Sequence, residues 1–470
     1  MKKKFYLVAG LIFSFFVLNQ NIFAQEKFDG SEDTFTLTKL RQCLTQNNPE
    51  IRLAQEELTR SLLDVKDAKS SFGPKIEFQA SGTFLANPPI DSIVLNVDDV
   101  INSMDWQGVG PVSTGQYITL YDGMENTLYN IGFTLQQPVF TWGKISTAYG
   151  IYKEVVSIKE LQLKNITKKL LTELETRLIS LCYIQQIQNV LEEETVFANR
   201  LVQYSEDAEK NGMLLKQDVL EARIKSKELD IAIKELEKQK ESQLIELERM
   251  TGLQIEAEKI DYEINEELFT QVLAKDRNQI LENALNGNQT SIQILLLLKN
   301  ISERTQKIAE NSVYWKPDFA VEMSANYAGS RFPLLEPNWR RKDDYSLNIS
   351  VGMKTTVWDG GKKLNEVNRK ISETKTSSIN IDDARAKIKH TLDEQWNTVD
   401  VCILKSEYLD LKIQTSESKI AQKETLFQSG YASEADVLNA KIEKCNQQVE
   451  KMQLELKKAA AIMTVNFLCE

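Results

Sequence analysis

The sequence contains a single histidine, His390, among its 470 residues. It also has no nucleophile, metal-binding or phosphate-loop motif of the kinds that enzymes use. His390 lies in a polar stretch with helical spacing, where its simplest interpretation is a solvated helix residue. We therefore expect no enzyme activity, no cofactor and no bound metal ion.

Cysteine is also scarce, and its few positions follow no pattern. The five cysteines are odd in number and far apart, so they form no recognisable disulfide or zinc framework. Most lie within helical patterns, and we interpret all of them as small buried apolar residues. They are Cys43, Cys182, Cys402, Cys445 and Cys469.

Long apolar runs are absent except near the N-terminus, where Phe5 to Leu18 follows three lysines and precedes the small residue Ala24. This pattern predicts a secretory signal peptide at residues 1–24, cleaved after Ala24. A retained membrane anchor is the alternative, but the run is shorter than the ~20 residues of a spanning helix. The first cysteine, Cys43, lies too far from the predicted cleavage site for a lipid anchor.

Positive charge is in deficit, with 57 Lys and Arg against 68 Asp and Glu, a net charge of -11. Removing residues 1–24 takes away three lysines and no acid, so the predicted mature chain has a net charge of -11 - 3 = -14. An acidic exported protein is a poor candidate for binding nucleic acid, and we expect no such partner.

What the sequence does contain is an internal repeat with an offset of 218 residues. NIGFTLQQPVFTWGK (130–144) returns as NISVGMKTTVWDGGK (348–362), and NGMLLKQDVLEARI (211–224) returns as SGYASEADVLNAKI (429–442). The offset aligns Gly143 with Gly361, Gly212 with Gly430 and Asp218 with Asp436. A repeat of this length favours one structure built of two similar halves over several unrelated domains.

Four segments alternate strictly between apolar and polar residues, as a strand with one apolar face does. Each has about the ten residues that a tilted membrane-spanning strand needs. Aromatic residues gather at the ends nearest the helical segments, as at a membrane interface: Phe72, Phe140, Trp142, Tyr314, Trp315 and Trp358. A soluble half-buried sheet shows the same alternation, but the predicted signal peptide, the strand lengths and these aromatics favour a membrane sheet. The apolar faces are predicted from Ile76 to Phe84, Tyr129 to Leu135, Phe319 to Tyr327 and Tyr345 to Met353.

Helical spacing fills most of the remaining chain. It begins near Thr36, as a helix pair or one helix bent near Pro49, and Ile280 to Val313 repeats this role in the second half. Long helical stretches run from Lys144 to about Lys210 and on to about Met250, and from Lys362 to Ser429 and from Glu434 to about Leu468. The last stretch has a coiled-coil seam that starts at Leu438 and Ile442. Residues 87–126 and 329–344 have the composition of loops.

In this order, and twice over, these features resemble the TolC-like outer membrane efflux family. The motifs with most weight are the strand-Gly-Lys junctions at Gly143, Gly360 and Gly361 and the helix-Gly-Asp-Val-Leu hairpins. The resemblance implies an α+β membrane protein whose duplicated protomer gives four strands to a trimeric twelve-stranded β-barrel and long antiparallel helices to a periplasmic α-helical barrel. The predicted parts are a signal peptide (1–24), a first repeat (25–250), a connecting equatorial segment (251–279) and a second repeat (280–470). Each repeat begins with a helix. The first then has a β-hairpin (75–140) and a long helical hairpin (144–250), and the second a β-hairpin (318–358) and a long helical hairpin (362–468).

The resemblance also implies the site residues and the partners. The hairpin turns would contact a periplasmic adaptor (membrane fusion) protein, and an RND or ABC inner-membrane transporter would drive export. Asp436 falls at the family's acidic constriction, beside Asn439 and the first-copy equivalent Asp218, although helix capping is an alternative role for both aspartates. An arginine that helps to lock the closed tube in the family falls on Ala432, so the gating bonds here must differ. The predicted turn contacts are Asn211, Gly212, Met213, Ser429, Gly430 and Tyr431.

The sequence therefore predicts a passive outer membrane exit duct of a Gram-negative bacterium, a homotrimer in contact with outer membrane lipid. It would serve a tripartite efflux or type I secretion system and carry small molecules or secreted proteins. A soluble periplasmic coiled-coil scaffold is the alternative; it accounts for the helices but not for four alternating strands. The transported substrate and the transporter class do not follow from the sequence.

Overall fold

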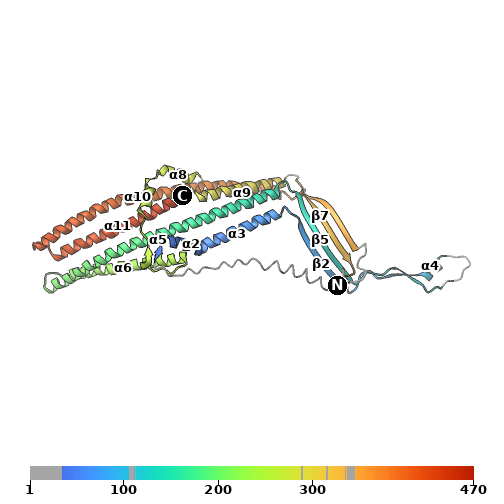
Figure 1. Cartoon of the computed structure of the whole chain (residues 1–470), viewed down its shortest axis with the longest axis horizontal. Helices are drawn as coiled ribbons and strands as arrows, with labels where there is room; N and C mark the ends of the chain where they lie inside the picture. Colours follow the sequence, from blue (N-terminus) through green and yellow to red (C-terminus); the bar gives the residue numbers. More distant parts are fainter. Residues whose placement is uncertain are drawn as a thin grey trace.

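The computed structural model is elongated, with long helices at one end and a β-sheet at the other (Figure 1). It describes residues 34–104, 111, 113–286, 289–313, 316–333, 335 and 344–469. The predicted signal peptide and the aromatic residues Tyr314 and Trp315 lie outside this part of the chain. None of the helices in the described ranges is long and apolar enough to cross a membrane.

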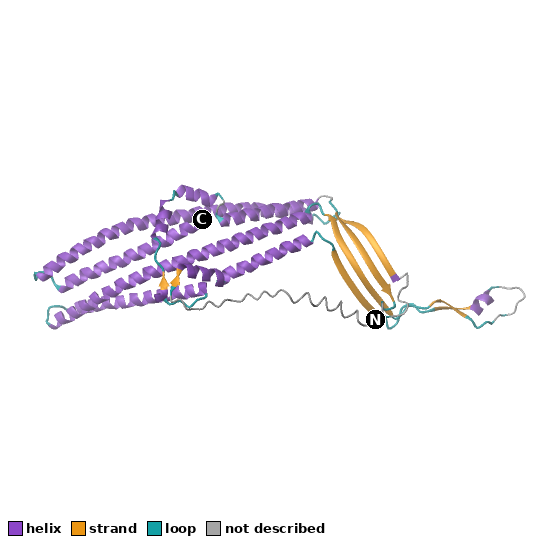
Figure 2. Cartoon of the chain, viewed as in Figure 1, coloured by secondary structure: helices purple, strands orange, loops and turns teal. Residues whose placement is uncertain are grey.

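Four long helices form two antiparallel hairpins (Figure 2). The first hairpin is α5 (Lys144–Lys210) and α6 (Lys216–Thr251), and the second is α10 (Lys362–Gln428) and α11 (Glu434–Cys469). Both copies have helices of 67 and 36 residues, and every boundary is displaced by the same 218 residues as the sequence repeat. The predicted helix bounds are confirmed to within about a residue, and α5 and α10 are each about 100 Å long at 1.5 Å per residue.

Two pairs of shorter helices flank the hairpins. The opening segment forms α2 (Leu37–Asn47) and α3 (Pro49–Ser70), so the first of the two predicted alternatives, a helix pair, is correct. Asn48 makes the break, because its side chain accepts from the Glu50 backbone N–H at 2.9 Å and donates to the Met250 carbonyl at 3.1 Å. Its counterpart in the second half is α8 (Arg277–Leu285) with α9 (Thr290–Val313).

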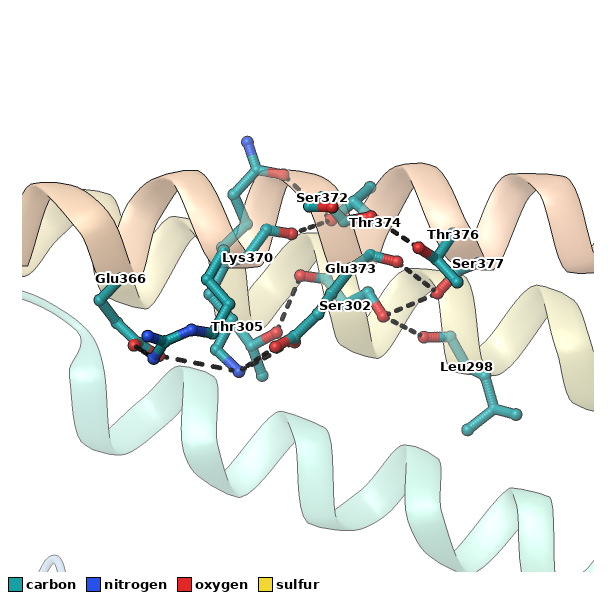
Figure 3. A network of polar contacts seen from close by, with 12 residues as sticks. Leu298, Ser302, Thr305, Glu366, Lys370, Ser372, Glu373, Thr374, Thr376 and Ser377 are labelled. Atoms are coloured by element: carbon teal, nitrogen blue, oxygen red, sulfur yellow. Dashed lines mark hydrogen bonds and ion pairs between the residues drawn. The ribbon is translucent and has the colours of Figure 1, made fainter.

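Helix α9 lies along α10, and the contact includes hydrogen bonds between small polar side chains besides the apolar packing of Ile292. Ser302 and Ser377 share a hydrogen bond of 3.0 Å between their hydroxyls, and the Thr374 hydroxyl donates to Gln306 Oε1 at 3.0 Å (Figure 3). Serine and threonine let two helix backbones approach closely and fix their relative position by hydrogen bonding.

The sheet has four antiparallel strands in the order β2 (Lys75–Phe84), β5 (Thr127–Phe140), β7 (Asp318–Gly329) and β8 (Tyr345–Lys354). Its register sets apolar residues opposite one another across the sheet: Phe78 lies opposite Phe133, which lies opposite Ala325, which lies opposite Leu347. The predicted apolar faces therefore join into one continuous face. Within the described residues, the outer edges of β2 and β8 have no neighbouring strand.

The connecting segment folds around the middle of the helices. Its elements are η1 (Ala257–Lys259), β6 (Ile260–Asp261) and α7 (Glu266–Ala274), and β6 pairs in parallel with β1 (Phe35–Thr36). Arg277 then attaches α8 to α10, donating to both carboxylate oxygens of Asp400 at 2.6 and 2.8 Å. Its guanidinium also lies 4.4 Å from the centre of the Trp396 ring. The segment thus closes the two halves into one body around apolar clusters that include Leu174, Leu247, Val399 and Ile462.

One prediction about the loops was wrong. Residues 87–126 were predicted from their composition to be a loop, but they contain β3 (Ile93–Asn96), α4 (Val97–Ser103) and β4 (Tyr117–Tyr121). β3 and β4 pair antiparallel into a ribbon that projects beyond the sheet (Figure 1). The ribbon forms because both of its short strands are apolar and free of charge, although Pro, Gly and Asp surround them.

Candidate functional site

The strand-to-helix junctions lie where the sequence predicted them, and their geometry explains the glycines. Gly143, Gly360 and Gly361 have φ values of 78°, 70° and 85°, in the left-handed region that glycine enters without strain. Trp142, which aligns with Gly360, shares this conformation at φ 53°. The sharp turn after each strand lets a long helix start directly below the sheet.

Ion pairs and caps fix both junctions. Lys144 Nζ lies 3.0 Å from both carboxylate oxygens of Asp318, which joins the start of α5 to the start of β7. In the second junction the Asp359 carboxylate accepts from the backbone N–H groups of Gly361 and Lys363, each at 3.0 Å. The angle between sheet and helices is therefore held by polar contacts in each copy.

The turns at the far ends of the hairpins are also alike. Gly212 and Gly430 have φ values of 73° and 79°. The next residue donates back into the helix in each copy, from Met213 N to Ala208 O and from Tyr431 N to Leu426 O, both at 2.8 Å. This is the Schellman pattern that ends helices at a glycine. The turns present apolar side chains to solvent, with Met213 78% and Tyr431 85% exposed.

Both predicted gate aspartates cap the helices that follow the turns. The Asp218 carboxylate accepts from Leu215 N at 2.9 Å, and the Asp436 carboxylate accepts from the Ser433 hydroxyl at 2.6 Å and from Ser433 N at 3.1 Å. These bonds, led by the Ser433 hydroxyl, lower the pKa of Asp436, and Lys423 nearby contributes less. The capping role is therefore present at both positions, and a role in a gate remains a proposal.

Asn439 lies one helical turn beyond Asp436, and both residues are exposed on α11. The Asn439 side chain donates to the Ala435 carbonyl at 2.9 Å and accepts from Lys225 Nζ at 3.4 Å. It is thus part of a contact between α11 and α6 of the other hairpin.

A stronger link between the hairpins was missed from the sequence. Arg200 on α5 donates to both carboxylate oxygens of Glu434 at the start of α11, at 2.6 and 3.2 Å. Lys441 on α11 lies 5.6 Å from the centre of the Phe197 ring, one helical turn away from Arg200. Since Arg200 and Glu434 are 234 residues apart, no local pattern in the sequence pairs them.

A buried carboxylic acid was also missed. Glu194 on α5 is only 2% exposed, and its Oε2 atom has no hydrogen-bond partner within the described structure. Burial raises its pKa to about 7, and a hydrogen bond with Asn446 opposes this shift. The signal was available, because Glu194 lies three residues after Leu191 and four before Ala198, which places it on the apolar stripe of the helix.

The metal-binding side chains of the described residues do not gather into a metal centre. No group of three or more His, Cys, Asp or Glu side chains there is arranged to hold a metal ion. His390 lies exposed on α10. None of the five cysteines forms a disulfide in the described structure; Cys43, Cys402 and Cys445 are buried as predicted, whereas Cys182 and Cys469 are partly buried.

Comparison with known proteins connects this architecture to a family. Residues 40–253 match the family model described as outer membrane efflux protein. No curated protein matches the chain. Among solved structures, the Campylobacter jejuni CmeC outer membrane channel is similar over 92% of this chain and 85% of its own, with 14% identity and a TM-score of 0.70.

Two further structures agree with this result. The outer membrane protein VceC of Vibrio cholerae is similar over 91% of this chain and 95% of its own, with 14% identity and a TM-score of 0.67. CusC, whose structures concern folding and transmembrane channel formation, is similar over 92% of this chain and 91% of its own, with 11% identity and a TM-score of 0.73. At these identities the likeness establishes the fold, which is the predicted α+β fold of outer membrane channels.

Proposed function

We propose that three copies of this chain form a passive exit duct across the outer membrane. The reason is that the chain belongs to the TolC-like outer membrane efflux protein family. The family is one of outer membrane efflux channels rather than enzymes, and the alternative of a soluble coiled-coil scaffold is not favoured.

The observation with most weight is the open four-stranded sheet. Its residues alternate between an apolar face and a polar face, and β2 and β8 both expose an edge. In lipid each unpaired backbone group costs several kcal/mol, so only a closed barrel is viable. Joining β8 of one protomer to β2 of the next closes a barrel of twelve strands from three protomers, as in the family. The apolar face would then contact outer membrane lipid.

The helical hairpins would extend the duct into the periplasm of a Gram-negative bacterium. Their turns, with exposed Met213 and Tyr431, are the proposed contacts for a periplasmic adaptor protein. Exposed apolar residues held on rigid glycine turns suit docking to another protein. An inner-membrane transporter of the RND or ABC type would supply energy and choose the cargo, small molecules or secreted proteins, because a passive duct has no energy source of its own.

Membrane fractionation followed by sizing in mild detergent tests this proposal. The expected result is recovery in the outer membrane fraction and a trimer as the main species, since one protomer leaves two sheet edges unpaired. Recovery in the soluble periplasmic fraction, or a monomer or dimer as the sole detergent species, would contradict it.

A further inference from the structure

A groove of about 770 Å³ lies between the two hairpins, lined by residues of α5, α6 and α11 and by Lys412 of α10. Its apolar lining includes Leu191, Leu229 and Ile442. This volume is in the range of binding sites for drug-sized ligands. Such sites combine apolar side chains with polar groups that orient the ligand.

The groove has an excess of negative charge. Besides Glu194, its charged lining consists of Lys225, Glu228 and Glu235 on α6, Lys412 on α10, and Glu443 and Glu450 on α11. Five carboxyl groups thus face two lysines. Cys445 is close enough for the Glu194 charge to affect it, but its thiol stays protonated, because burial raises its pKa to about 12.

Glu194 distinguishes this groove from an ordinary acidic surface. Its side chain reaches the lining, yet the residue is 98% buried, and Oε2 has no hydrogen-bond partner in the described structure. An unpaired buried carboxyl oxygen is costly, so native structures usually satisfy such atoms. A bound positive charge would satisfy this one.

We propose that the groove binds an amphipathic organic cation, with the aromatic or aliphatic body of the ligand on the apolar lining and its positive charge at Glu194. A metal ion fits less well, because the acidic side chains that line the groove are not grouped closely enough to hold one within the described structure. An anion would meet the net negative lining. The site is formed by helices of one chain, so this inference does not depend on the trimeric duct.

Ethidium, a planar aromatic cation whose fluorescence increases when it leaves water, is a suitable probe for the full-length protein in mild detergent. Binding above the empty-micelle background is expected for ethidium, and not for the aromatic anion 8-anilinonaphthalene-1-sulfonate. Glu194→Gln preserves the shape of the side chain and removes its charge, and should weaken ethidium binding about tenfold. The matched control is Glu192→Gln, which removes the same charge from an exposed position on the same helix and should leave binding unchanged.

Two further readouts separate a specific site from general acidity. Ala232→Trp should fill the groove and abolish ethidium binding without changing any charge. Ethidium affinity should rise between pH 6 and 8 as Glu194 ionises, and Glu194→Gln should remove that rise. The inference is overturned if Glu194→Gln and Glu192→Gln weaken binding equally, if Ala232→Trp has no effect, or if the anion binds as well as the cation.

Discussion

At the scale of single residues, two carboxylic acids of this chain show opposite effects of their surroundings. Asp436 is half exposed and accepts hydrogen bonds from Ser433, so its charged form is stabilised and its pKa is lowered. Glu194 is buried, so its charged form is disfavoured and its pKa rises to about 7, although a hydrogen bond with Asn446 opposes the shift. Hydrogen bonding and desolvation thus decide which acid is charged at neutral pH.

The first prediction concerns Glu194 and stability. Its unfolded pKa is near 4.5 and its folded pKa about 7, so the folded state holds the proton more tightly. Binding of this proton stabilises the folded state fully below pH 4.5, and this stabilisation is lost as the pH rises through 7. The loss is about 3 kcal/mol per protomer for a shift of this size. Glu194→Gln should therefore raise the melting temperature at pH 8 and change it little at pH 4.5. An equal change at both pH values would show that Glu194 is not protonated in the folded protein.

The second prediction concerns Asp436 in the proposed constriction. Three copies around a narrow passage would attract cations, so Asp436→Ala should weaken cation selectivity and block by trivalent cations in planar-bilayer conductance. Asn439→Asp should strengthen both effects, while Asp218→Ala should change them less. Asp436→Ala also removes the hydrogen bonds from Ser433 that cap α11, which should lower the free energy of unfolding by about 1 kcal/mol. Reduced stability with unchanged selectivity would leave Asp436 with the capping role alone.

At the scale of helices and strands, the third prediction tests which face of the sheet meets lipid. A cation at the membrane midplane costs about 2 to 4 kcal/mol, so Ile131→Arg or Val351→Arg should reduce the amount of assembled trimer. Arginine at Asn130 or Ser350, on the polar face of the same strands, should be better tolerated. Each apolar position is compared with its neighbour on the same strand. Equal loss of trimer from the apolar and the polar positions would mean that the faces are misassigned.

The elements differ in how far the sequence predicts them. The long helices and the four strands were predicted closely, because periods of 3.6 and 2 persist over many residues and glycines such as Gly212 mark the ends. The ribbon of β3 and β4 was missed, because strands of four and five residues give too short a pattern. The pairing of β1 with β6 involves two residues in each strand and depends on contacts between distant segments. The Arg200–Glu434 link was missed for the same reason, whereas the position of Glu194 on an apolar stripe was a signal that could have been used.

At the scale of the whole molecule, the duplication gives the chain two helical hairpins of equal length with equivalent turns. The hairpins contact each other mainly through α5 and α11, where Leu191, Leu201, Leu438 and Ile442 share one apolar cluster. At the level of Leu201, the Arg200–Glu434 ion pair adds a polar link beside this apolar packing. In the proposed ring of twelve helices, the tip would widen if neighbouring hairpins moved apart. A link between hairpins therefore opposes opening.

The last prediction follows from this geometry. An exposed ion pair contributes about 0.2 to 1 kcal/mol, and three copies acting together would amount to about 0.6 to 3 kcal/mol. Breaking the link with Arg200→Glu should then shift the closed–open equilibrium towards the open state about tenfold. Single-channel recordings in planar bilayers would show this as a higher open fraction. The double variant Arg200→Glu with Glu434→Arg restores a pair of opposite charges and should return the open fraction towards that of the original protein. If the double variant behaves like the single one, the change comes from altered charge near the tip, and the two hairpins are held together by the Phe197–Lys441 contact and the apolar cluster instead.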